Sequence, residues 1–240
     1  RWGVKSVLFL PYTLFTSWLL RRALLSCSKL FPVSDAMARM LVINGISVKR
    51  LSVIHNPVIV PKRVQKNVVK NTILSAGRIS KDKGIQFVIR SLPLIPKMKL
   101  VIAGRGGFES ELRKIVNELN LNHRVDFLGF VNGKTLNNIV ARACVNVLLG
   151  TVYEALPRSV LEASALGVPS VVSSAGGSGE AVGDGGIVVT SLDEESIANA
   201  ILTVLKNRTT YSKRARLHVK KEFSSDTIGK ELAKEYKLLL

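Results

Sequence analysis

From residue 72 to residue 206, short apolar runs rich in β-branched residues alternate with longer amphipathic stretches. We expect strands at Thr72–Ala76, Lys99–Ala103, Val125–Leu128, Val145–Leu149, Pro169–Ser173 and Gly186–Val189. We expect helices at Ile85–Leu94, Glu109–Asn120, Leu136–Ala143, Ser159–Leu166, Gly179–Val182 and Glu194–Lys206. Strands that are joined through helices run in the same direction and form a parallel sheet with helices on both faces. The alternation therefore predicts an α/β fold with a doubly wound parallel sheet.

The residues on either side of this alternation carry weaker signals. Before it we expect short strands at Leu30–Val33 and Leu51–Ile54, a helix at Ala36–Asn44 between the N-cap Ser34-Asp35 and the C-cap Gly45, and a linker from Pro57 to Lys70. After it we expect two further helices, Thr210–Glu222 and Asp226–Leu240. The pattern thus predicts a small segment, one large sheet domain and a helical end.

The net charge of +18 is concentrated at the two ends of the chain. Residues 1–70 hold 12 Lys/Arg against one acidic residue, residues 71–205 hold 13 against 12, and residues 206–240 hold 10 against 4. Basic ends of this kind suit an anionic membrane surface or nucleic acid, or they are simply solvated. Because RNA-binding, zinc-finger and helix-turn-helix signatures are missing, we favour a peripheral anionic membrane and expect no specific nucleic acid.

The first thirty residues also bear on whether the chain associates with a membrane. The apolar stretch Ser6–Leu20 is broken by Pro11 and is shorter than the roughly 20 residues of a membrane-spanning helix. It has no small-residue cleavage site, which argues against a signal peptide. A helix over Thr13–Leu30 fits two interpretations equally well, a helix at the membrane interface and an ordinary helix packed on a sheet.

Two carboxylates eight residues apart are the strongest candidates for ligand binding. Glu154 follows the buried run Val145–Leu149, and Glu162 lies about two turns into the helix that Pro157 is expected to open. The carboxyl ends of parallel strands form the edge at which open α/β sheets bind ligands. Carboxylates at that edge accept hydrogen bonds from vicinal hydroxyls, so the pair favours a sugar or ribose over an anion.

A glycine-bearing loop, Gly77–Gly84, follows the first strand of the alternation. It is not a phosphate-binding P-loop, because its Lys precedes the glycine and no Ser or Thr follows at the required place. Arg78 and Lys83 would nonetheless bind a diphosphate at a helix N-terminus, the first as a planar fork and the second as a point charge. The cysteines and histidines show no metal-ligand spacing, so we expect no metal site.

Four segments in this order, GRISKDKG, FLGFV, YEALPRSVLEASALGVPSVVSS and GGSGEAV, resemble the catalytic half of retaining glycosyltransferases of family four. These are GT-B enzymes that use nucleotide-activated sugars. The resemblance covers about residues 50–240 and implies three parts. These are a partial or reduced acceptor-side segment (1–58), a Rossmann-like nucleotide-sugar-binding domain (59–222) and a helix that crosses toward the amino-terminal segment (223–240).

The resemblance also assigns roles to individual residues. It places Arg78 and Lys83 on the donor diphosphate, Glu154 near the reacting carbon of the donor sugar and Glu162 on the ribose hydroxyls. We take Glu154, Arg78 and Lys83 as the catalytic group; the remaining donor-binding residues that it implies are Gly77, Gly104, Val131, Ala155 and Leu156. It implies no cofactor, since a UDP- or GDP-linked sugar is the substrate.

The resulting expectation is a hexosyltransferase-type enzyme that retains anomeric configuration, with a lipid-linked or glycan acceptor. We expect it in the cytoplasm, at the cytoplasmic membrane face. Two departures weigh on this expectation: Ala155 stands where the family usually has Gly, and the family's first domain is about twice as long as the residues before Asn56. The alternatives are a fragment or assembly module that binds nucleotide-sugar without catalysis, and a nucleic-acid-binding α/β domain.

Overall fold

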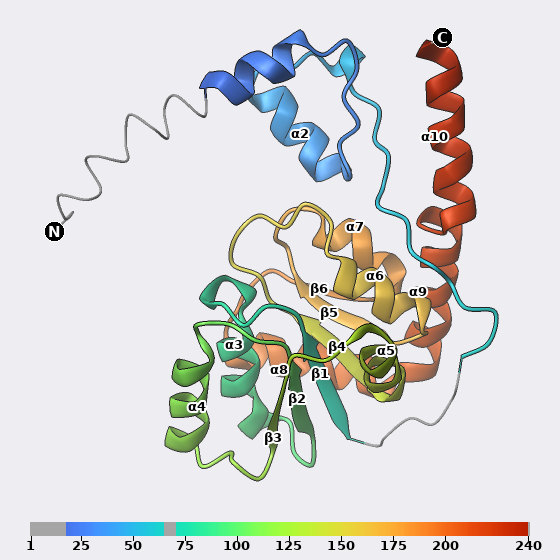
Figure 1. The fold of residues 1–240 in the computed structure, drawn as a ribbon. Helices are drawn as coiled ribbons and strands as arrows, with labels where there is room; N and C mark the ends of the chain where they lie inside the picture. Colours follow the sequence, from blue (N-terminus) through green and yellow to red (C-terminus); the bar gives the residue numbers. More distant parts are fainter. Residues whose placement is uncertain (1–17, 65–70, 240) are drawn as a thin grey trace, which may run out of the picture.

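The computed structural model describes residues 18–64 and 71–239 of the chain (Figure 1). Most of the apolar stretch Ser6–Leu20, the start of the expected helix Thr13–Leu30 and most of the basic run from Lys62 to Lys70 lie outside the described residues. Within them, residues 18–26 are helical. The helices of the described ranges include none with the length and apolar character needed to cross a membrane.

Six parallel strands form one sheet in the order β3-β2-β1-β4-β5-β6. The strands are β1 Thr72–Ala76, β2 Lys99–Ala103, β3 Val125–Gly129, β4 Val145–Leu148, β5 Ser170–Ser173 and β6 Gly186–Val189. Ile73 of β1 is paired with Leu100 of β2 on one side and with Val145 of β4 on the other. Strands β2 and β3 therefore follow β1 on one side of the sheet, and β4, β5 and β6 follow it on the other side. The expected Rossmann-like parallel sheet is confirmed.

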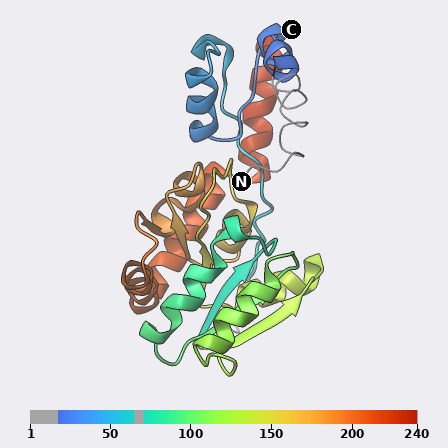
Figure 2. The same ribbon diagram turned by 90° about the vertical axis from the view of Figure 1, so that its left-hand side faces the viewer.

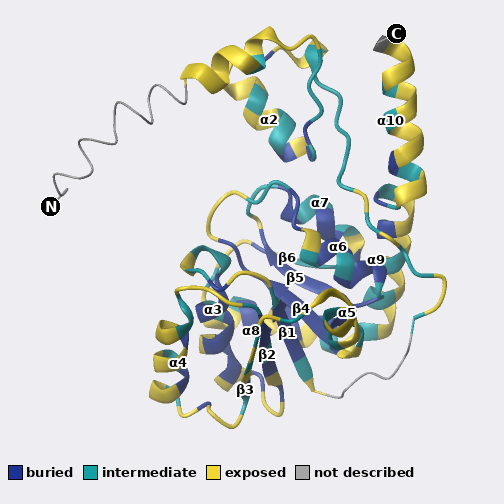
Figure 3. Cartoon of the chain, in the orientation of Figure 1, coloured by how far each residue is buried: buried dark blue, intermediate teal, exposed yellow. Residues whose placement is uncertain are grey.

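Helices cover both faces of this sheet. They are α3 Ile85–Ser91, α4 Glu109–Glu118, α5 Gly133–Arg142, α6 Arg158–Ala165, α7 Ser178–Val182, α8 Glu194–Lys206 and α9 Arg208–Glu222. Ile73 belongs to the apolar core under α3, α4 and α8, whereas its neighbour Leu74 belongs to the core under α5 and α6. Since successive side chains of a strand point to opposite faces, each strand contributes to both layers. The inner strands β1, β4 and β5 are accordingly buried along most or all of their length (Figure 3), whereas the edge strands β3 and β6 are partly exposed.

Two helix boundaries differ from the sequence-based expectation for identifiable reasons, and two expected strands are not formed as such. The helix expected to reach Leu94 ends at Ser91, and Leu92–Leu94 forms a 3-10 turn because Pro93 has no N–H to continue the α-helix. Helix α5 begins at Gly133, earlier than expected, because the side chain of Asn132 caps it by accepting from the Thr135 amide. The two short strands expected before residue 57 form only one isolated bridge, Leu30 with Leu51.

The amino-terminal segment rests above the sheet domain and beside the last helix (Figures 1 and 2). Its helix α2, Asp35–Ile43, is capped by Ser34, which accepts from the Met37 amide. The last helix, α10, runs from Ser225 to Leu239. The ammonium of Lys29 lies 3.7 Å from the carboxylate of Glu235, so α10 contacts the segment that precedes α2.

The expected linker is in part an ordered crossing. Val58 forms an isolated bridge with Ser224, and the Val58 amide donates to the Phe223 carbonyl at 2.8 Å. The hydroxyl of Ser225 donates to the Val58 carbonyl. The chain thus passes from the amino-terminal segment to the sheet domain against the junction of α9 and α10.

Candidate functional site

A cavity of about 390 Å³ opens at the carboxyl ends of β1 and β4. This is the place where the strand order reverses, and open α/β sheets bind their ligands at such a point. Its lining residues are Ser75, Ala76, Gly77, Arg78, Lys83, Ile85, Leu148, Glu154, Pro157, Arg158 and Ser159. Two loops therefore meet at the cavity: the loop after β1 and the loop that joins β4 to α6.

Lys83 and Glu154 form an ion pair in this cavity. Lys83 lies in the short 3-10 helix η2, Lys81–Lys83, and its ammonium donates to Oε1 of Glu154 in the loop after β4. Both side chains are largely buried. A lysine and a carboxylate separated by 71 positions in the chain are thus adjacent at the edge of the sheet.

Arg78 lies on the open side of the same cavity. Its guanidinium is 3.7 Å from the carboxylate of Asp82, and its side chain is mostly exposed. Because an exposed ion pair contributes little to stability, Asp82 does not anchor this arginine firmly. Arg78 and Lys83 therefore offer one exposed and one buried cation to a ligand in the cavity.

Glycines allow the loops around the cavity to approach one another closely. Gly84 has a φ of +71°, and a Cβ there would lie 1.8 Å from the Leu149 carbonyl oxygen. A Cβ on Gly104 would lie 1.7 Å from the Gly77 carbonyl oxygen. The Thr151 amide also donates to the Asp82 carbonyl at 2.8 Å. The contacts of Gly84 and Thr151 hold the loop of Lys83 directly against the loop of Glu154, and that of Gly104 joins the loops after β1 and β2.

The loop before α7, with Gly176 and Gly177, packs on the backbone of Glu154. The Gly177 amide donates to the Glu154 carbonyl at 2.7 Å, and a Cβ on Gly176 would lie 2.1 Å from the same oxygen. Burial raises the pKa of the neighbouring Tyr153 phenol above its usual value, and the charge of Glu180 acts in the same direction. The loop before α7 thus fixes the backbone from which the Glu154 side chain projects.

The structure gathers only some of the predicted site residues around this cavity. Gly77, Arg78, Lys83 and Glu154 line it, whereas Glu162, Gly104, Val131, Ala155 and Leu156 are not among its lining residues. Leu156 is buried in the core between α6 and α9, and Val131 packs on the core beside α5. Glu162 lies on α6 with Oε1 3.3 Å from Nη2 of Arg158. Arg158 and Ser159 at the start of α6 are lining residues that sequence reasoning missed, although their place after Pro157 was a usable signal.

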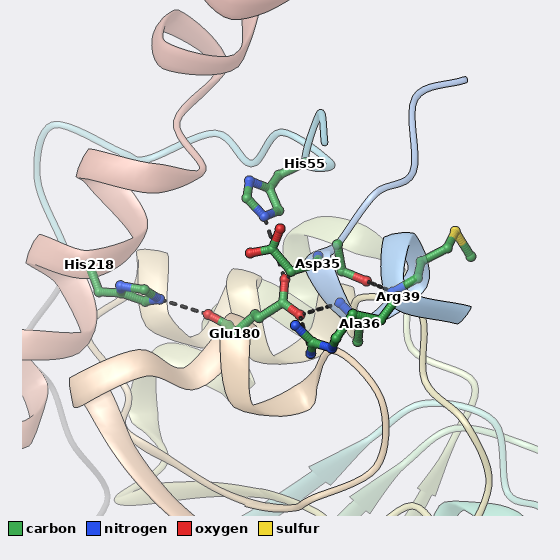
Figure 4. Close-up of polar contacts among 8 residues, drawn as sticks. Asp35, Ala36, Arg39, His55, Glu180 and His218 are labelled. Carbon is green, nitrogen blue, oxygen red and sulfur yellow. Dashed lines mark hydrogen bonds and ion pairs between the residues drawn. The ribbon is translucent and has the colours of Figure 1, made fainter. Parts of the chain in front are cut away.

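Glu180 is a second carboxylate at this edge, for which the sequence suggested no role. Its two oxygens accept from the amides of Asp35 and Ala36 at 2.7 Å each, at the N-terminus of α2 (Figure 4). Arg39 and His55 approach it within 3.8 and 3.7 Å. Its carbonyl oxygen is 2.8 Å from Nε2 of His218 on α9. Glu180 therefore joins the amino-terminal segment to the sheet domain.

Within the described ranges, no group of three or more His, Cys, Asp or Glu residues is placed to hold a metal ion. The cations near the cavity are instead side chains of the protein. A ligand with a diphosphate and hydroxyl groups would find both of its complements here, cations for the phosphates and a carboxylate for the hydroxyls. That the reaction needs no metal stays a prediction.

Comparison with known proteins gives consistent results. The family model described as glycosyl transferases group 1 matches residues 60–221. An uncharacterized glycosyltransferase of Methanocaldococcus jannaschii is 39% identical over 176 residues, which cover 70% of this chain and 45% of the relative. A GDP-mannose-dependent monoacylated alpha-(1-6)-phosphatidylinositol monomannoside mannosyltransferase of Corynebacterium glutamicum is 29% identical over 170 residues, covering 65% of this chain and 44% of the relative. The chain thus spans about half the length of the curated relatives that it matches.

Solved structures agree on the fold. The crystal structure of Anabaena HepE with UDP and glucose superposes with a TM-score of 0.79 at 22% identity, covering 88% of this chain and 63% of that chain. The apo lipopolysaccharide outer core galactosyltransferase WaaB superposes with a TM-score of 0.78 at 18% identity, covering 89% and 63%. At these identities the likeness concerns the fold alone, and it confirms the GT-B type.

Proposed function

The chain belongs to the glycosyl transferases group 1 family, and from that premise we propose that it binds a nucleotide-sugar in the cavity between Lys83 and Glu154 and supports transfer of the sugar to an acceptor. The observation that carries this proposal is the Lys83–Glu154 ion pair at the point where the strand order reverses. The pair places a phosphate-binding cation next to a hydroxyl-binding carboxylate. A nucleotide-sugar needs these two groups side by side, where its diphosphate meets the sugar.

In this proposal the ion pair opens when the donor binds. The ammonium of Lys83 moves to the diphosphate together with the guanidinium of Arg78, and the released Glu154 accepts hydrogen bonds from the donor sugar. Developing charge on the leaving phosphate is then stabilised by the two cations in place of a metal. Glu162 would hold the ribose hydroxyls of UDP or GDP.

We further propose that the chain is of family-four type and transfers with retention. The order of its four segments supports this assignment. The acceptor would attack on the face from which the nucleotide leaves, and the departing phosphate oxygen would take the acceptor's proton. No side chain then has to act as a nucleophile on the opposite face of the sugar.

We also propose that the acceptor is lipid-linked or a glycan and that the protein works at the cytoplasmic membrane face. The basic ends of the chain support this, and so does the name of the Corynebacterium glutamicum relative, a mannosyltransferase for a phosphatidylinositol mannoside. The amino-terminal part favours a second candidate, a donor-binding module without catalysis. Residues 18–57 contribute only α2 and the helical stretch 18–26 as α-helices.

Nucleotide calorimetry tests the donor site with a matched pair of variants. Lys83→Ala should weaken UDP or GDP binding by roughly 10- to 100-fold, because a charge-assisted bond contributes about 1.5–3 kcal/mol. Lys81→Ala removes the same charge two residues away, from a side chain outside the cavity lining, and should change binding less than about twofold. Equal effects of the two substitutions, or no nucleotide binding by the wild-type chain, would contradict the proposed site.

A further inference from the structure

Most of the basic excess at the carboxyl-terminal end lies on helix α9. The cations of residues 206–222 are Lys206, Arg208, Lys213, Arg214, Arg216, Lys220 and Lys221, against the one carboxylate of Glu222. Residues 223–240 hold three lysines against three acidic residues and are neutral. Helix α9 therefore carries +5 of the excess and Lys206, the last residue of α8, the remaining +1, whereas residues 223–240, which include α10, carry none.

The fold adds the linker's cations to those of α9. Arg216 donates to the Ala165 carbonyl at 2.5 Å and also to the Pro61 carbonyl, which fixes residues 59–63 along the helix. Two hollows of about 470 and 720 Å³ flank this contact, and both are lined by Lys62 and Arg216. The cations that line one or both of them are Lys62, Arg208, Lys213, Arg216 and Lys220, and the one carboxylate among their lining residues is Asp226.

The outer face of α9 combines charge with exposed aliphatic surface. Lys213, Arg214, Lys220 and Lys221 are exposed and surround Leu217, which is itself 67% exposed. The spacing of these five residues puts them on one face of the helix. Ile59, on the adjoining linker, is 82% exposed. In the described part of the chain, the one ion pair to a cation of α9 joins Lys221 to Glu222.

We propose that α9 together with residues 59–63, here called the α9 surface, is a docking surface for an anionic lipid bilayer. Cations that outnumber the nearby carboxylates repel one another, and an anionic partner relieves that repulsion. Exposed Leu217 and Ile59 among the cations suit a bilayer, whose interface accepts both aliphatic and basic side chains. A surface that binds single-stranded nucleic acid usually exposes aromatic side chains on which the bases stack. The aromatic Tyr211 of α9 is half-buried, so the bilayer is the better match.

This inference rests on the proposed membrane association and names the surface responsible for it. The donor site is separate, because no residue of the α9 surface is among the lining residues of the donor cavity. Nucleotide binding and membrane binding can therefore be lost one without the other.

Vesicle sedimentation with two matched triple variants tests the inference. The first replaces Lys213, Arg214 and Lys220 by Gln; the second replaces Lys230, Lys234 and Lys237 of α10 by Gln. Both variants lose three exposed charges from neighbouring helices. At low salt the wild-type chain should bind anionic vesicles made of phosphatidylcholine and phosphatidylglycerol. It should not bind neutral vesicles of phosphatidylcholine alone. Since each basic residue near an anionic bilayer changes partitioning by about fivefold, the first variant should lose about 100-fold and the second far less.

Three outcomes of the vesicle experiment would contradict the proposal in different ways. Equal losses in the two variants would show that bulk charge, and not the α9 surface, is responsible. Vesicle binding by the wild type that the α9 variant retains would overturn the assignment of the surface while leaving membrane association intact. Tighter binding to a single-stranded oligonucleotide, uncompeted by vesicles, would overturn the bilayer in favour of nucleic acid. Calorimetry with UDP on the same samples separates these results from the donor site, which both variants should retain.

Discussion

Glu154 and Glu180 follow adjacent strands of one sheet, yet the fold uses them in opposite ways. Their side chains are similarly buried, at 14% and 21% exposed. Within the described residues the one ion-pair partner of Glu154 is the flexible side chain of Lys83. Glu180 instead accepts from two backbone amides and lies near Arg39 and His55. The two carboxylates therefore differ little in burial. They differ in whether their hydrogen-bond partners can move away and be replaced by a ligand.

A partner that can move leaves a carboxylate available to a ligand. A lysine side chain reorients by rotating its own bonds, whereas backbone amides at the N-terminus of α2 move only with the helix. The comparison therefore supports the proposed ligand-binding role of Glu154, whereas Glu180 joins the two parts of the molecule. Substitutions at the two positions should separate these roles.

The largest effect is expected from Glu154→Ala on catalysis. Nucleotide release from a nucleotide-sugar should fall by roughly 100- to 1,000-fold, the usual loss when a group that stabilises the transition state is removed. UDP affinity should stay within about threefold, because the nucleotide contacts remain. Glu111→Ala, on the exposed face of α4, is the control and should leave both quantities unchanged. A wild-type chain that binds the donor but never turns it over would favour the non-catalytic module.

Glu180→Ala should have the next largest effect, on stability and not on the donor. It leaves the amides of Asp35 and Ala36 without their acceptors, at a cost of about 2–4 kcal/mol for the two bonds. Hydrogen exchange should accelerate at these two amides and through α2, while nucleotide affinity remains within about twofold. Glu180→Gln, which keeps one carbonyl oxygen, should show a smaller acceleration. Loss of nucleotide binding in Glu180→Ala would contradict the proposal that Glu154 and Glu180 have separate roles.

Ala155→Gly should give the smallest effect and refines the comparison at the residue that follows Glu154. The Ala155 carbonyl lies against Gly177, so the backbone is already held in place there. Removing the methyl group should cost at most about 1 kcal/mol of stability through added backbone freedom. Affinity for the sugar part of the donor should rise by no more than a few-fold. A rise of 100-fold would show that the methyl group obstructs the donor site.

The sheet and the meeting of Lys83 with Glu154 were predictable because they follow from local patterns. Each strand is an apolar run, and residues that follow parallel strands must gather at one edge. The partners of Glu180 were not predictable in this way. Its bonds to Asp35 and Ala36 span about 145 positions and depend on how two separately formed parts pack together.

The spatial arrangement of the charges was likewise not predictable from the sequence, because it depends on contacts between distant segments. The sequence shows two basic ends and a neutral last helix, but it does not reveal that residues 59–63 lie along α9. That arrangement depends on single contacts such as Arg216 with the carbonyl of Pro61. The end of α3 at Ser91, in contrast, follows from a local cause, Pro93, that could have been used.

The bridge between Val58 and Ser224 has a mechanical consequence. The chain crosses between its two parts at this bridge on its way into the sheet domain, and α10 begins beside it and reaches back to the amino-terminal segment. Because both crossings meet at this bridge, we expect rotation about it to be the easiest motion between the two parts. Glu180 of α7 accepts from the amides of Asp35 and Ala36 at the N-terminus of α2, so we expect it to restrain that rotation. Loss of these two hydrogen bonds should free α2, and their re-formation should return it to one orientation.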